Sequence, residues 1–424
     1  MGSDFFATTI GEQVTLQRGF DITKKEQQQG DVPVVSSGGV SSFHNQFKVT
    51  APGVVLGRKG SLGTVYFVEK DFWPHDTTLW VKDFKGNNPH YVYYFFKGMS
   101  DELKKMDVGA ANPALNRNHV HPLRVQWPAR KLQDAIVSVA SVLDKKIALN
   151  NQINQTLEQM AQTLFKSWFV DFDPVIDNAL DAGSYIPEIF EARVERRKAV
   201  RESADFKPLP DDIRQLFPEK LIESEEGLIP DGWELTKVGK VSECFDKHRV
   251  PLSKKQREER RGSIPYYGAT SVMDYVDEAI FDDIYLLIGE DGSVVKLDGT
   301  PFIQYIWGPA WINNHAHVLK GINSVSTEQL MLFFQQTNIN AYVTGAVQLK
   351  INQRNMNSIP FVKATEEINE RFYDFIAPLY AKIRAIKEEN EQLAKLRDTL
   401  LPKLISGELR LDSPEVEQAK ALVD

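Results

Sequence analysis

Residues 146–164 read KIALNNQINQTLEQMAQTL, and residues 382–400 read KIRAIKEENEQLAKLRDTL. The two stretches align without a gap at an offset of 236 residues (146 to 382), and Asn154 and Asn390 fall at matching positions. In both, apolar residues recur at three- and four-residue steps, which is the periodicity of one face of an α-helix. A long helical segment that occurs twice predicts a chain built from two related halves.

The apolar pattern extends beyond these stretches and predicts two long helices that pair. Steps of this kind over several heptads are typical of a coiled-coil seam. At about 1.5 Å per residue, each helix is expected to be roughly 55 Å long. Asn154 and Asn390 fall near the seam, where a polar residue can fix the register, but solvent-facing positions suit them equally well. The positions assigned to helix pairing are Ile136, Leu143, Ile147, Leu157 and Leu164 in the first helix and Leu379, Ile383, Leu393 and Leu400 in the second.

A segment of short predicted strands precedes each helix. Both segments join β-branched and aromatic runs with Gly, Pro, Asn and Asp, which is typical of strands and turns. In the second segment, strands are expected at 264–267, 284–288, 293–297 and 302–306, and a helix near 328–336. Long helices do not alternate regularly with these strands, which argues against a doubly wound parallel sheet. The predicted fold class is α+β, with two mixed α/β modules that are each followed by a long helix.

These patterns divide the chain into six parts. The connector between the two copies is long enough for the chain to travel back, which allows the helices to pair as an antiparallel coiled coil with pseudo-two-fold symmetry. The parts are a first module at 1–128, a central long helix at 129–170, a connector at 171–231, a second module at 232–363, a C-terminal long helix at 364–411 and a tail at 412–424.

The formal net charge of −8 is concentrated in the connector, where residues 171–231 contain 16 Asp and Glu against 8 Lys and Arg. The modules are close to neutral, and a near-neutral module can bind nucleic acid through a local basic face. Cys244 is the single cysteine, which excludes a disulfide within the chain. No apolar run approaches the roughly 20 residues of a membrane span, and no signal peptide opens the chain. A reducing cytoplasm is therefore the expected compartment.

Three further segments resemble the specificity (S) subunits of Type I restriction–modification systems. They are FKSWFVDF at 165–172, LFPEKLIESEEGLIPDGWEL at 216–235 and LPKLISGELR at 401–410. Together with the duplicated plan, the resemblance covers essentially the whole chain and is loosest inside the modules. It implies two target-recognition domains, each of which recognises one half of a bipartite site in double-stranded DNA, and helices that set the spacing of the half-sites.

The resemblance also implies partner proteins that carry the chemistry. Two methyltransferase (M) subunits would dock on the helices and use S-adenosylmethionine to methylate adenine N6. Restriction (R) subunits would use ATP and Mg²⁺ for translocation and cleavage. No cofactor, metal or membrane is therefore expected to bind this chain.

Loops of the first module contain side chains that suit base edges or phosphates. Arg58 and Lys59 lie in a glycine-flanked turn, where two cations suit a phosphate or a guanine edge, but a hairpin turn with solvated charges fits as well. Ser36 and Ser37 follow an early strand and are small enough to approach DNA closely. Asn116 and Arg117 follow the repeated Gly-Ala pair at 109–110 and offer donors and an acceptor.

The aligned loops of the second module provide a second set of candidates. At the place of Arg58 and Lys59 it has Glu290 and Asp291, which repel phosphate but can accept a hydrogen bond from a cytosine amino group. The basic run before its first strand also contains two glutamates, so a solvated helix is an alternative. The DNA-binding candidates of this module are Lys254, Lys255, Arg257, Thr270, Ser271, Asn352 and Arg354.

Motifs for metal binding and catalysis are missing or weak. His315 and His317 have the alternate spacing of ligands on a strand, but no third ligand is nearby and Leu79 aligns with His317, so ordinary polar contacts are favoured. The chain has neither a Gly-x-x-x-x-Gly-Lys-Ser/Thr phosphate loop nor the Asn/Asp-Pro-Pro-aromatic motif of adenine methyltransferases. A non-catalytic specificity subunit is therefore predicted, and a self-sufficient methyltransferase or nuclease is disfavoured. The alternatives are an adaptor of another methyltransferase-based defence system and a coiled-coil scaffold that does not bind DNA.

Overall fold

The structure, a computed structural model, describes residues 5–106, 114–345 and 348–422, which form two compact units. Unit 1 comprises Met1–Gln152 and Ile386–Asp424, and unit 2 comprises Ile153–Ala385. The repeated Gly-Ala pair at 109–110 and Ala346 of its second copy lie outside the described residues. Among the described residues, no helix combines the length and the apolar character needed to cross a membrane.

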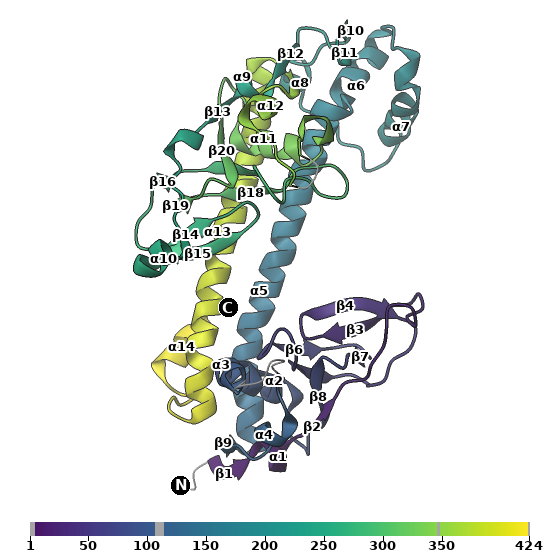
Figure 1. Cartoon of the computed structure of the whole chain (residues 1–424). Coiled ribbons are helices and arrows are strands. Elements are labelled where there is room, and N and C mark those ends of the chain that lie inside the picture. The colour runs from purple at the N-terminus through teal and green to yellow at the C-terminus, as the bar shows by residue number, and fades with distance from the viewer. Residues whose placement is uncertain (1–4, 107–113, 346–347, 423–424) are drawn as a thin grey trace. The chain divides into compact units, whose positions relative to one another are not determined.

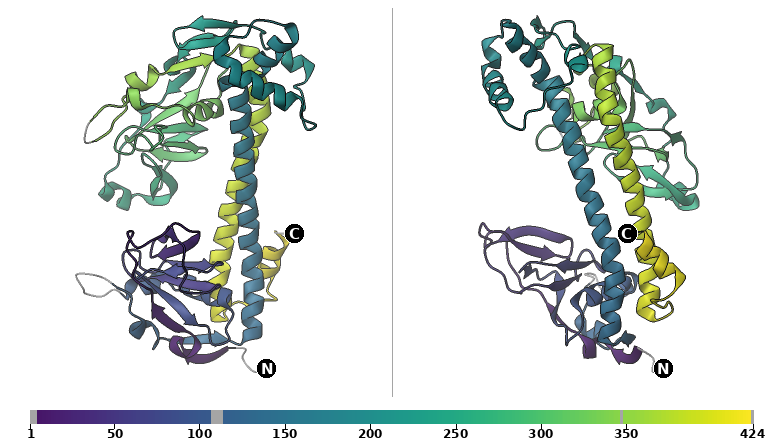
Figure 2. Two further views of the ribbon diagram at one scale, coloured as in Figure 1. Left: turned by 90° about the vertical axis from the view of Figure 1, so that its right-hand side faces the viewer. Right: turned by 180° about the vertical axis from the view of Figure 1, so that it is seen from behind.

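Two long helices, α5 (Arg130–Phe165) and α13 (Glu366–Ser406), contribute residues to both units. In unit 1, Ile136 near the start of α5 shares a buried cluster with Leu400 near the end of α13. Further along α5, Asn150 Nδ2 donates to Asn390 Oδ1 at 2.9 Å. The two helical segments of unit 1 are therefore antiparallel, and they lie side by side in Figure 2.

Unit 2 contains the other ends of the same helices. A π-helical turn, Lys166–Val170, follows α5 and carries Trp168, whose ring centroid lies 5.7 Å from that of Phe372 near the start of α13. These helical segments are again antiparallel. Of the positions assigned to helix pairing, five are buried (Ile136, Leu143, Ile383, Leu393 and Leu400) and four are partly buried (Ile147, Leu157, Leu164 and Leu379).

The repeated asparagines occupy different environments. Asn154 is 5% exposed, and neither of its amide atoms has a hydrogen-bond partner. Asn390 is only half-buried, accepts a hydrogen bond from Asn150 and donates one to Asn151 Oδ1 at 3.0 Å. Because an unpaired buried amide costs free energy, Asn154 weakens its helix contact, whereas Asn390 forms part of a polar link between the helices.

In the first module (Figure 1), antiparallel strands form a four-stranded sheet in the order β2-β8-β5-β6. A three-stranded sheet, β4-β3-β7, lies beside it, and the helix α2 packs Tyr91 and Phe95 into the core with Val54. β1 pairs with β9, which joins the start of the module to the residues that lead into α5. The elements are β1 (Phe5–Thr9), α1 (Ile10–Gln13), β2 (Thr15–Arg18), β3 (Val32–Ser36), β4 (Gly39–His44), β5 (Gly53–Gly57), β6 (Val65–Val68), β7 (Trp73–Pro74), β8 (Thr78–Asp83), α2 (Pro89–Gly98), α3 (Ser100–Lys105), α4 (Arg117–Val120) and β9 (Arg124–Pro128).

The second module repeats this plan. Its main sheet has the order β13-β20-β17-β18, its second sheet has the order β15-β14-β19-β16, and β12 pairs with β21 before α13 begins. The elements are β12 (Glu234–Lys237), α9 (Val238–Val241), β13 (Ser242–Cys244), η3 (Asp246–His248), α10 (Lys254–Glu259), β14 (Arg261–Tyr267), β15 (Val272–Val276), β16 (Phe281–Asp282), β17 (Tyr285–Gly289), β18 (Ile303–Ile306), β19 (Pro309–Ile312), β20 (Ala316–Gly321), α11 (Thr327–Phe334), η4 (Asn340–Tyr342), α12 (Gln353–Asn357) and β21 (Pro360–Lys363).

The connector folds within unit 2, and the C-terminal residues fold within unit 1. In the connector, Arg197 Nη2 lies 2.6 Å from Asp177 Oδ2, which links its two main helices. In unit 1, Val416 of α14 is buried in the core of the first module. The elements are α6 (Asp173–Ala182), η2 (Glu188–Phe190), α7 (Glu191–Arg201), α8 (Asp211–Arg214), β10 (Leu221–Ser224), β11 (Gly227–Pro230) and α14 (Pro414–Ala421).

One expected strand, at 293–297, is wrong. The chain turns there because the Asp298 carboxylate accepts a hydrogen bond from Thr300 N–H at 2.9 Å, and Leu297 is fully exposed. The next strand, β18, begins only at Ile303. Within the expected strand only Val295 forms a β-bridge, with Pro301, because the chain reverses between them in a turn in which Gly299 N–H donates to Lys296 O at 3.0 Å.

Candidate nucleic-acid interface

The candidate loops of the first module meet at one end of its main sheet. Arg58 directly follows β5, and its backbone N–H donates to Thr77 O at 2.9 Å. Its guanidinium Nη1 donates to the backbone oxygen of Asp76 at 3.3 Å. Ser37, in the turn between β3 and β4, donates its N–H to Thr77 Oγ1 at 3.3 Å. The 75–77 loop therefore joins two loops that are distant in sequence.

Charge at this end of the sheet is positive. Arg18, the last residue of β2, places Nη2 2.7 Å from Asp76 Oδ2. Asp76 is thus a shared carboxylate for Arg18 and Arg58. Partial burial, followed by the charge of Arg18, lowers the pKa of the Arg58 guanidinium, which nevertheless stays protonated at neutral pH. Asp21 lies close to Asp76, so two carboxylates face the two guanidinium groups, and the excess of positive charge comes from the neighbouring Lys59 and Arg117.

The segment that starts α4 completes this end of the module. Leu115 N–H donates to Arg58 O at 2.9 Å, which fixes the segment against the residue after β5. Asn116 caps α4 by accepting the Asn118 N–H at 2.9 Å, and Arg117 is exposed beside it. We call this end of the module the first loop edge. The structure brings together there Ser36, Ser37, Arg58, Lys59, Asn116 and Arg117, with Arg18 and Asp76.

Strand register identifies the equivalent residues of the second module. Leu56 of β5 pairs with Leu79, and Ile288 of β17 pairs with His317. Two residues after Leu56 lies Arg58, and two residues after Ile288 lies Glu290. Glu290 makes the same backbone hydrogen bonds, because its N–H donates to His315 O at 2.8 Å and its oxygen accepts the Ile351 N–H at 2.9 Å. Glu290 therefore takes the place of Arg58.

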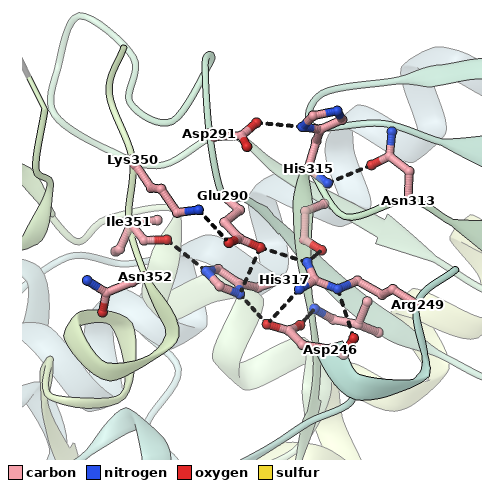
Figure 3. Close-up of polar contacts among 12 residues, drawn as sticks. Asp246, Arg249, Glu290, Asp291, Asn313, His315, His317, Lys350, Ile351 and Asn352 are labelled. Carbon is pink, nitrogen blue, oxygen red and sulfur yellow. Dashed lines mark hydrogen bonds and ion pairs between the residues drawn. The ribbon is translucent and has the colours of Figure 1, made fainter. Parts of the chain in front are cut away.

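The Glu290 carboxylate belongs to a network of charged groups (Figure 3). Glu290 Oε2 lies 2.8 Å from Arg249 Nη1, and Glu290 Oε1 lies 3.1 Å from Lys350 Nζ. Asp246 Oδ2 lies 2.5 Å from His317 Nδ1 and 3.3 Å from Arg249 Nη2. Burial by itself raises the pKa of Asp246, but hydrogen bonds from His317 and Val318 N–H and the charges of His317 and Arg249 outweigh it, so that the pKa is lowered.

Cys244, Asp246 and His317 are close enough together to be considered as a metal site. However, both ring nitrogens of His317 already face oxygen atoms, at 2.5 Å from Asp246 Oδ2 and 2.8 Å from Ile351 O. Burial, followed by the charge of Asp246, raises the pKa of the Cys244 thiol to about 12, so that it keeps its proton at neutral pH. The arrangement is that of a hydrogen-bonded ion network and offers a metal neither a thiolate nor a free imidazole nitrogen.

Asp291, the residue after Glu290, pairs with His315, whose Nδ1 lies 2.7 Å from Asp291 Oδ1. The turn with the exposed Thr270 and Ser271 lies nearby, since Gln304 of the adjacent β18 donates to Gly268 O at 2.9 Å. Asn352 caps α12 by accepting the Asn355 N–H at 2.8 Å. We call this end of the second module the second loop edge. The structure brings together there Thr270, Ser271, Asn352 and Arg354, with Glu290, Asp291 and His315.

The basic run of the second module lies against the end of β14 that leads into the turn with Thr270 and Ser271. The Arg257 guanidinium of α10 lies 5.1 Å from the ring centroid of Tyr266, the residue before the last of β14, and its Nε lies 3.0 Å from Asp274 Oδ2. Arg257 is therefore held by an ion pair three residues beyond Ser271. Lys254 and Lys255 are exposed in the same short helix.

The sequence candidates did not include Arg18, Asp76, Asp246 and Arg249. Each of them lies at the end of a strand or just beyond it, outside any motif. The signal that would find them is the pairing of β2 with β8 and of β13 with β20, since this pairing places Arg18 opposite Leu79 and Asp246 beside His317. Local sequence does not contain that register.

Comparisons with known proteins agree with the two-fold plan. A family model described as the Type I restriction modification DNA specificity domain matches residues 4–159 and 230–395. The chain is 28% identical over 329 residues to the Type I restriction enzyme HindI specificity subunit of Haemophilus influenzae, which covers 70% of this chain and 71% of that one. It is 23% identical over 348 residues to the Type I restriction enzyme MjaIX specificity subunit of Methanocaldococcus jannaschii, at 76% and 69% coverage.

A solved structure shows a related fold. The crystal structure of the S subunit of a Type I restriction–modification system from M. genitalium superposes with a TM-score of 0.50 at 17% identity, and the match covers 95% of this chain and 96% of that one. The two stretches matched by the family model each contain one module and most of the long helix that follows it. The chain therefore belongs to the family of Type I restriction–modification specificity subunits, with two repeated target-recognition domains.

Proposed function

We propose that each module recognises one half-site of a bipartite target in double-stranded DNA. The observation that supports this most strongly is the pair of loop edges. They share the same backbone hydrogen bonds, from Leu115 to Arg58 and from Ile351 to Glu290, but carry side chains of opposite charge. Two sites that have the same backbone arrangement but different side chains suit the recognition of two different sequences.

The first loop edge suits an anionic or guanine-rich surface. The guanidinium groups of Arg18 and Arg58 can donate to phosphate oxygens or to guanine O6 and N7. Asn116 and Arg117 lie at the same edge and add further donors and an acceptor. Phosphate contacts of this kind make the affinity depend on salt, whereas contacts to base edges give sequence preference.

The second loop edge suits different bases. The Asp291 carboxylate can accept a hydrogen bond from a cytosine amino group, and the Asn352 amide can donate to and accept from adenine. Arg354 is exposed beside them and can contact phosphate. This combination of an acceptor, an amide and a cation predicts a half-site that differs from the first.

The chemistry is assigned to partner subunits. In this proposal the chain is non-catalytic and positions two methyltransferase subunits, which bind S-adenosylmethionine and methylate adenine N6 in each half-site. An enzyme that modifies a base within a duplex must first flip that base out of the stack, so specificity and catalysis can reside in different chains. Restriction subunits, with ATP and Mg²⁺, would join the same assembly.

The test is single-molecule methylome sequencing of the source strain with and without this gene. A bipartite adenine-methylated motif that disappears on deletion is the expected result, and it would also give the target sequence. A methylome that is unchanged on deletion, while the methyltransferase partner is expressed, would contradict the proposal. Loss of a motif with only one specified part would favour an adaptor of another kind.

A further inference from the structure

His317 lies on β20 with a side chain that is 1% exposed, and both of its ring nitrogens face oxygen atoms (Figure 3). Nδ1 lies 2.5 Å from Asp246 Oδ2, and Nε2 lies 2.8 Å from Ile351 O. A backbone carbonyl oxygen and an ionised carboxylate can only accept hydrogen bonds. Both nitrogens must therefore carry a proton, which makes the His317 side chain a buried imidazolium.

The charged groups around His317 suit that state. The residues that face it are Asp246 and Arg249 from the η3 turn, Glu290 from the end of β17, Lys350 from the segment before α12 and the protonated Cys244 of β13. Glu290 Oε2 lies 3.8 Å from His317 Nδ1, so that two carboxylates lie close to the ring. With His317 protonated, three cations face two carboxylates, and Lys350 is the most solvent-exposed of the cations. Opposite charges at these distances favour the protonated ring.

The imidazolium holds one backbone residue that leads into the second loop edge. Ile351 is fully buried, its N–H donates to Glu290 O at 2.9 Å, and its oxygen accepts from His317. The next residue is Asn352, the exposed cap of α12, and Arg354 follows in the first turn of that helix. Ile351 is thus held on both sides, and its position sets the position of two exposed side chains.

Among the described residues of the first module, no charged side chain takes the place of His317. Leu79 occupies the position of His317, and Leu115 occupies that of Ile351. Leu115 N–H makes the equivalent bond to Arg58 O, also at 2.9 Å. An aliphatic side chain cannot donate to Leu115 O, so the ionic hold is specific to the second module.

We propose that His317 is a positioning residue for DNA recognition by the second module, and that its protonated ring holds Ile351 so that Asn352 and Arg354 face the second half-site. Loss of either ring proton places a nitrogen lone pair against an oxygen atom and releases this hold. Recognition of the second half-site therefore depends on the His317 side chain, and recognition of the first does not. The inference rests on the proposed function of the modules.

Substitutions at His317 give the first test. Chains with His317→Gln and His317→Leu replace the natural gene, and the methylome of the strain is sequenced. The glutamine can donate to Asp246 or to Ile351 but cannot span both, and the leucine is the residue of the first module. We expect the first half of the motif to remain, and the preference at one or more positions of the second half to fall about tenfold. Leu79→Met, a volume-conserving core change at the equivalent position, is the matched control and should leave both halves intact.

Binding to half-site duplexes gives a second test, in which each chain carries its own internal reference. The complex of the chain with its methyltransferase subunits is titrated with two duplexes, each of which keeps one half-site and has the other scrambled. We expect His317→Gln to weaken binding through the second half-site about tenfold and to leave binding through the first unchanged. The unchanged first half-site shows that the variant chain is folded and assembled.

The outcomes separate the inference from the function on which it rests. Equal loss of binding through both half-sites in His317→Gln, or a motif that His317→Gln leaves unchanged, would overturn the role of His317 alone. A natural methylome without a bipartite motif would overturn the proposed function itself.

Discussion

The two loop edges share a backbone frame but treat charge in opposite ways. In both, a segment before a short helix donates an N–H to the residue that follows a core strand, at 2.9 Å. The first edge keeps its charges near the surface, since the Arg18 side chain is 56% exposed. At the second edge, Glu290 and its partner Arg249 are mostly buried, with side chains that are 14% and 11% exposed. Backbone bonds thus set where the loops lie, and a few side chains determine what those loops can contact.

Of the changes that test this comparison, removal of Arg249 should have the largest effect on the free energy of unfolding. Arg249 Nη1 donates to Glu290 Oε2 and, at 2.6 Å, to Ala316 O. Arg249→Ala therefore removes the buried donor of both oxygen atoms and leaves the Glu290 carboxylate with the half-exposed Lys350 as its nearest remaining cation. We expect the free energy of unfolding to fall by about 3 kcal/mol, as for other buried ion pairs that lose one partner. Arg18→Ala removes the exposed cation of the first edge and should cost less than about 1 kcal/mol. Urea denaturation of both variants measures the difference, and equal losses would show that the two edges do not differ in burial.

Arg58→Ala tests the first edge as a DNA-binding surface. We expect the affinity of the methyltransferase complex for a duplex with only the first half-site to fall about tenfold to a hundredfold. Affinity through the second half-site should not change. If Arg58 contacts a phosphate, the slope of log affinity against log salt should decrease by about one; if it contacts a guanine, preference at one base should be lost instead.

Lys131→Ala is the matched control for Arg58, because it also removes one cation from unit 1 but lies in the first turn of α5. It should leave both half-site affinities within about twofold, since an exposed charge that does not itself contact the DNA acts only through a screened field. A loss as large as that of Arg58→Ala would mean that net charge, and not the first loop edge, governs binding.

Tyrosine contacts with the long helices distinguish the units by a smaller effect. In unit 1, Tyr94 OH donates to Asp144 Oδ2 at 2.5 Å, and Asp144 keeps a second partner, Arg397. In unit 2, Tyr305 OH both donates to Glu328 Oε1 at 2.7 Å and accepts from Arg384 Nη1 at 2.5 Å.

Tyr305→Phe therefore breaks two hydrogen bonds to charged groups, whereas Tyr94→Phe breaks one. We expect losses in the free energy of unfolding of about 2 and 1 kcal/mol, respectively. Thermal or urea unfolding of the two variants checks the order, and a larger loss for Tyr94→Phe would contradict it. Tyr93→Phe, beside Tyr94 on α2, is a control that should change stability by less than either.

The helices could be predicted from sequence because their information is local. Leu143 and Leu400 repeat at helical steps, and both are buried. The same kind of local pattern failed at 293–297, where the Asp298 carboxylate accepts the Thr300 N–H and closes a turn. A period identifies an element only when no nearby side chain offers the backbone a competing hydrogen bond.

The candidate edges could be predicted in part, and what was missed depends on register. The alignment of Arg58 with Glu290 follows from the repeat, and the strands place both residues at the same position. The contacts of Arg18 with Asp76 and of Asp246 with His317 join residues more than fifty positions apart. They follow from how β2 and β13 pair with their neighbours, and the residue types in those strands do not predict that pairing.

The smallest expected effect is the change with acid pH in the stability difference between the natural chain and Asp246→Asn. The pKa of Asp246 is lowered in the folded chain. The ionised Asp246 carboxylate therefore stabilises the folded chain at pH values above its pKa in the unfolded chain, which is about 3.9. This stabilisation is lost as the pH falls through the lower pKa of the folded chain. Asp246→Asn removes the charge at every pH. The gap in urea midpoint between the natural chain and this variant should thus be constant from about pH 7 to pH 5 and should narrow toward pH 3.

Glu12→Gln provides the comparison from the first module. The pKa of Glu12 is also lowered, by hydrogen bonds from Thr9 and Thr8, but its carboxylate lies at the surface, where solvent screens the interaction. The midpoint gap between the natural chain and this variant should be small at every pH. If the Glu12 gap were as large as the Asp246 gap, surface capping would matter as much as the buried network. If the Asp246 gap did not narrow with acid, the stabilising group at the second loop edge would not be the ionised carboxylate, and the charge assigned to His317 would lose its counterion.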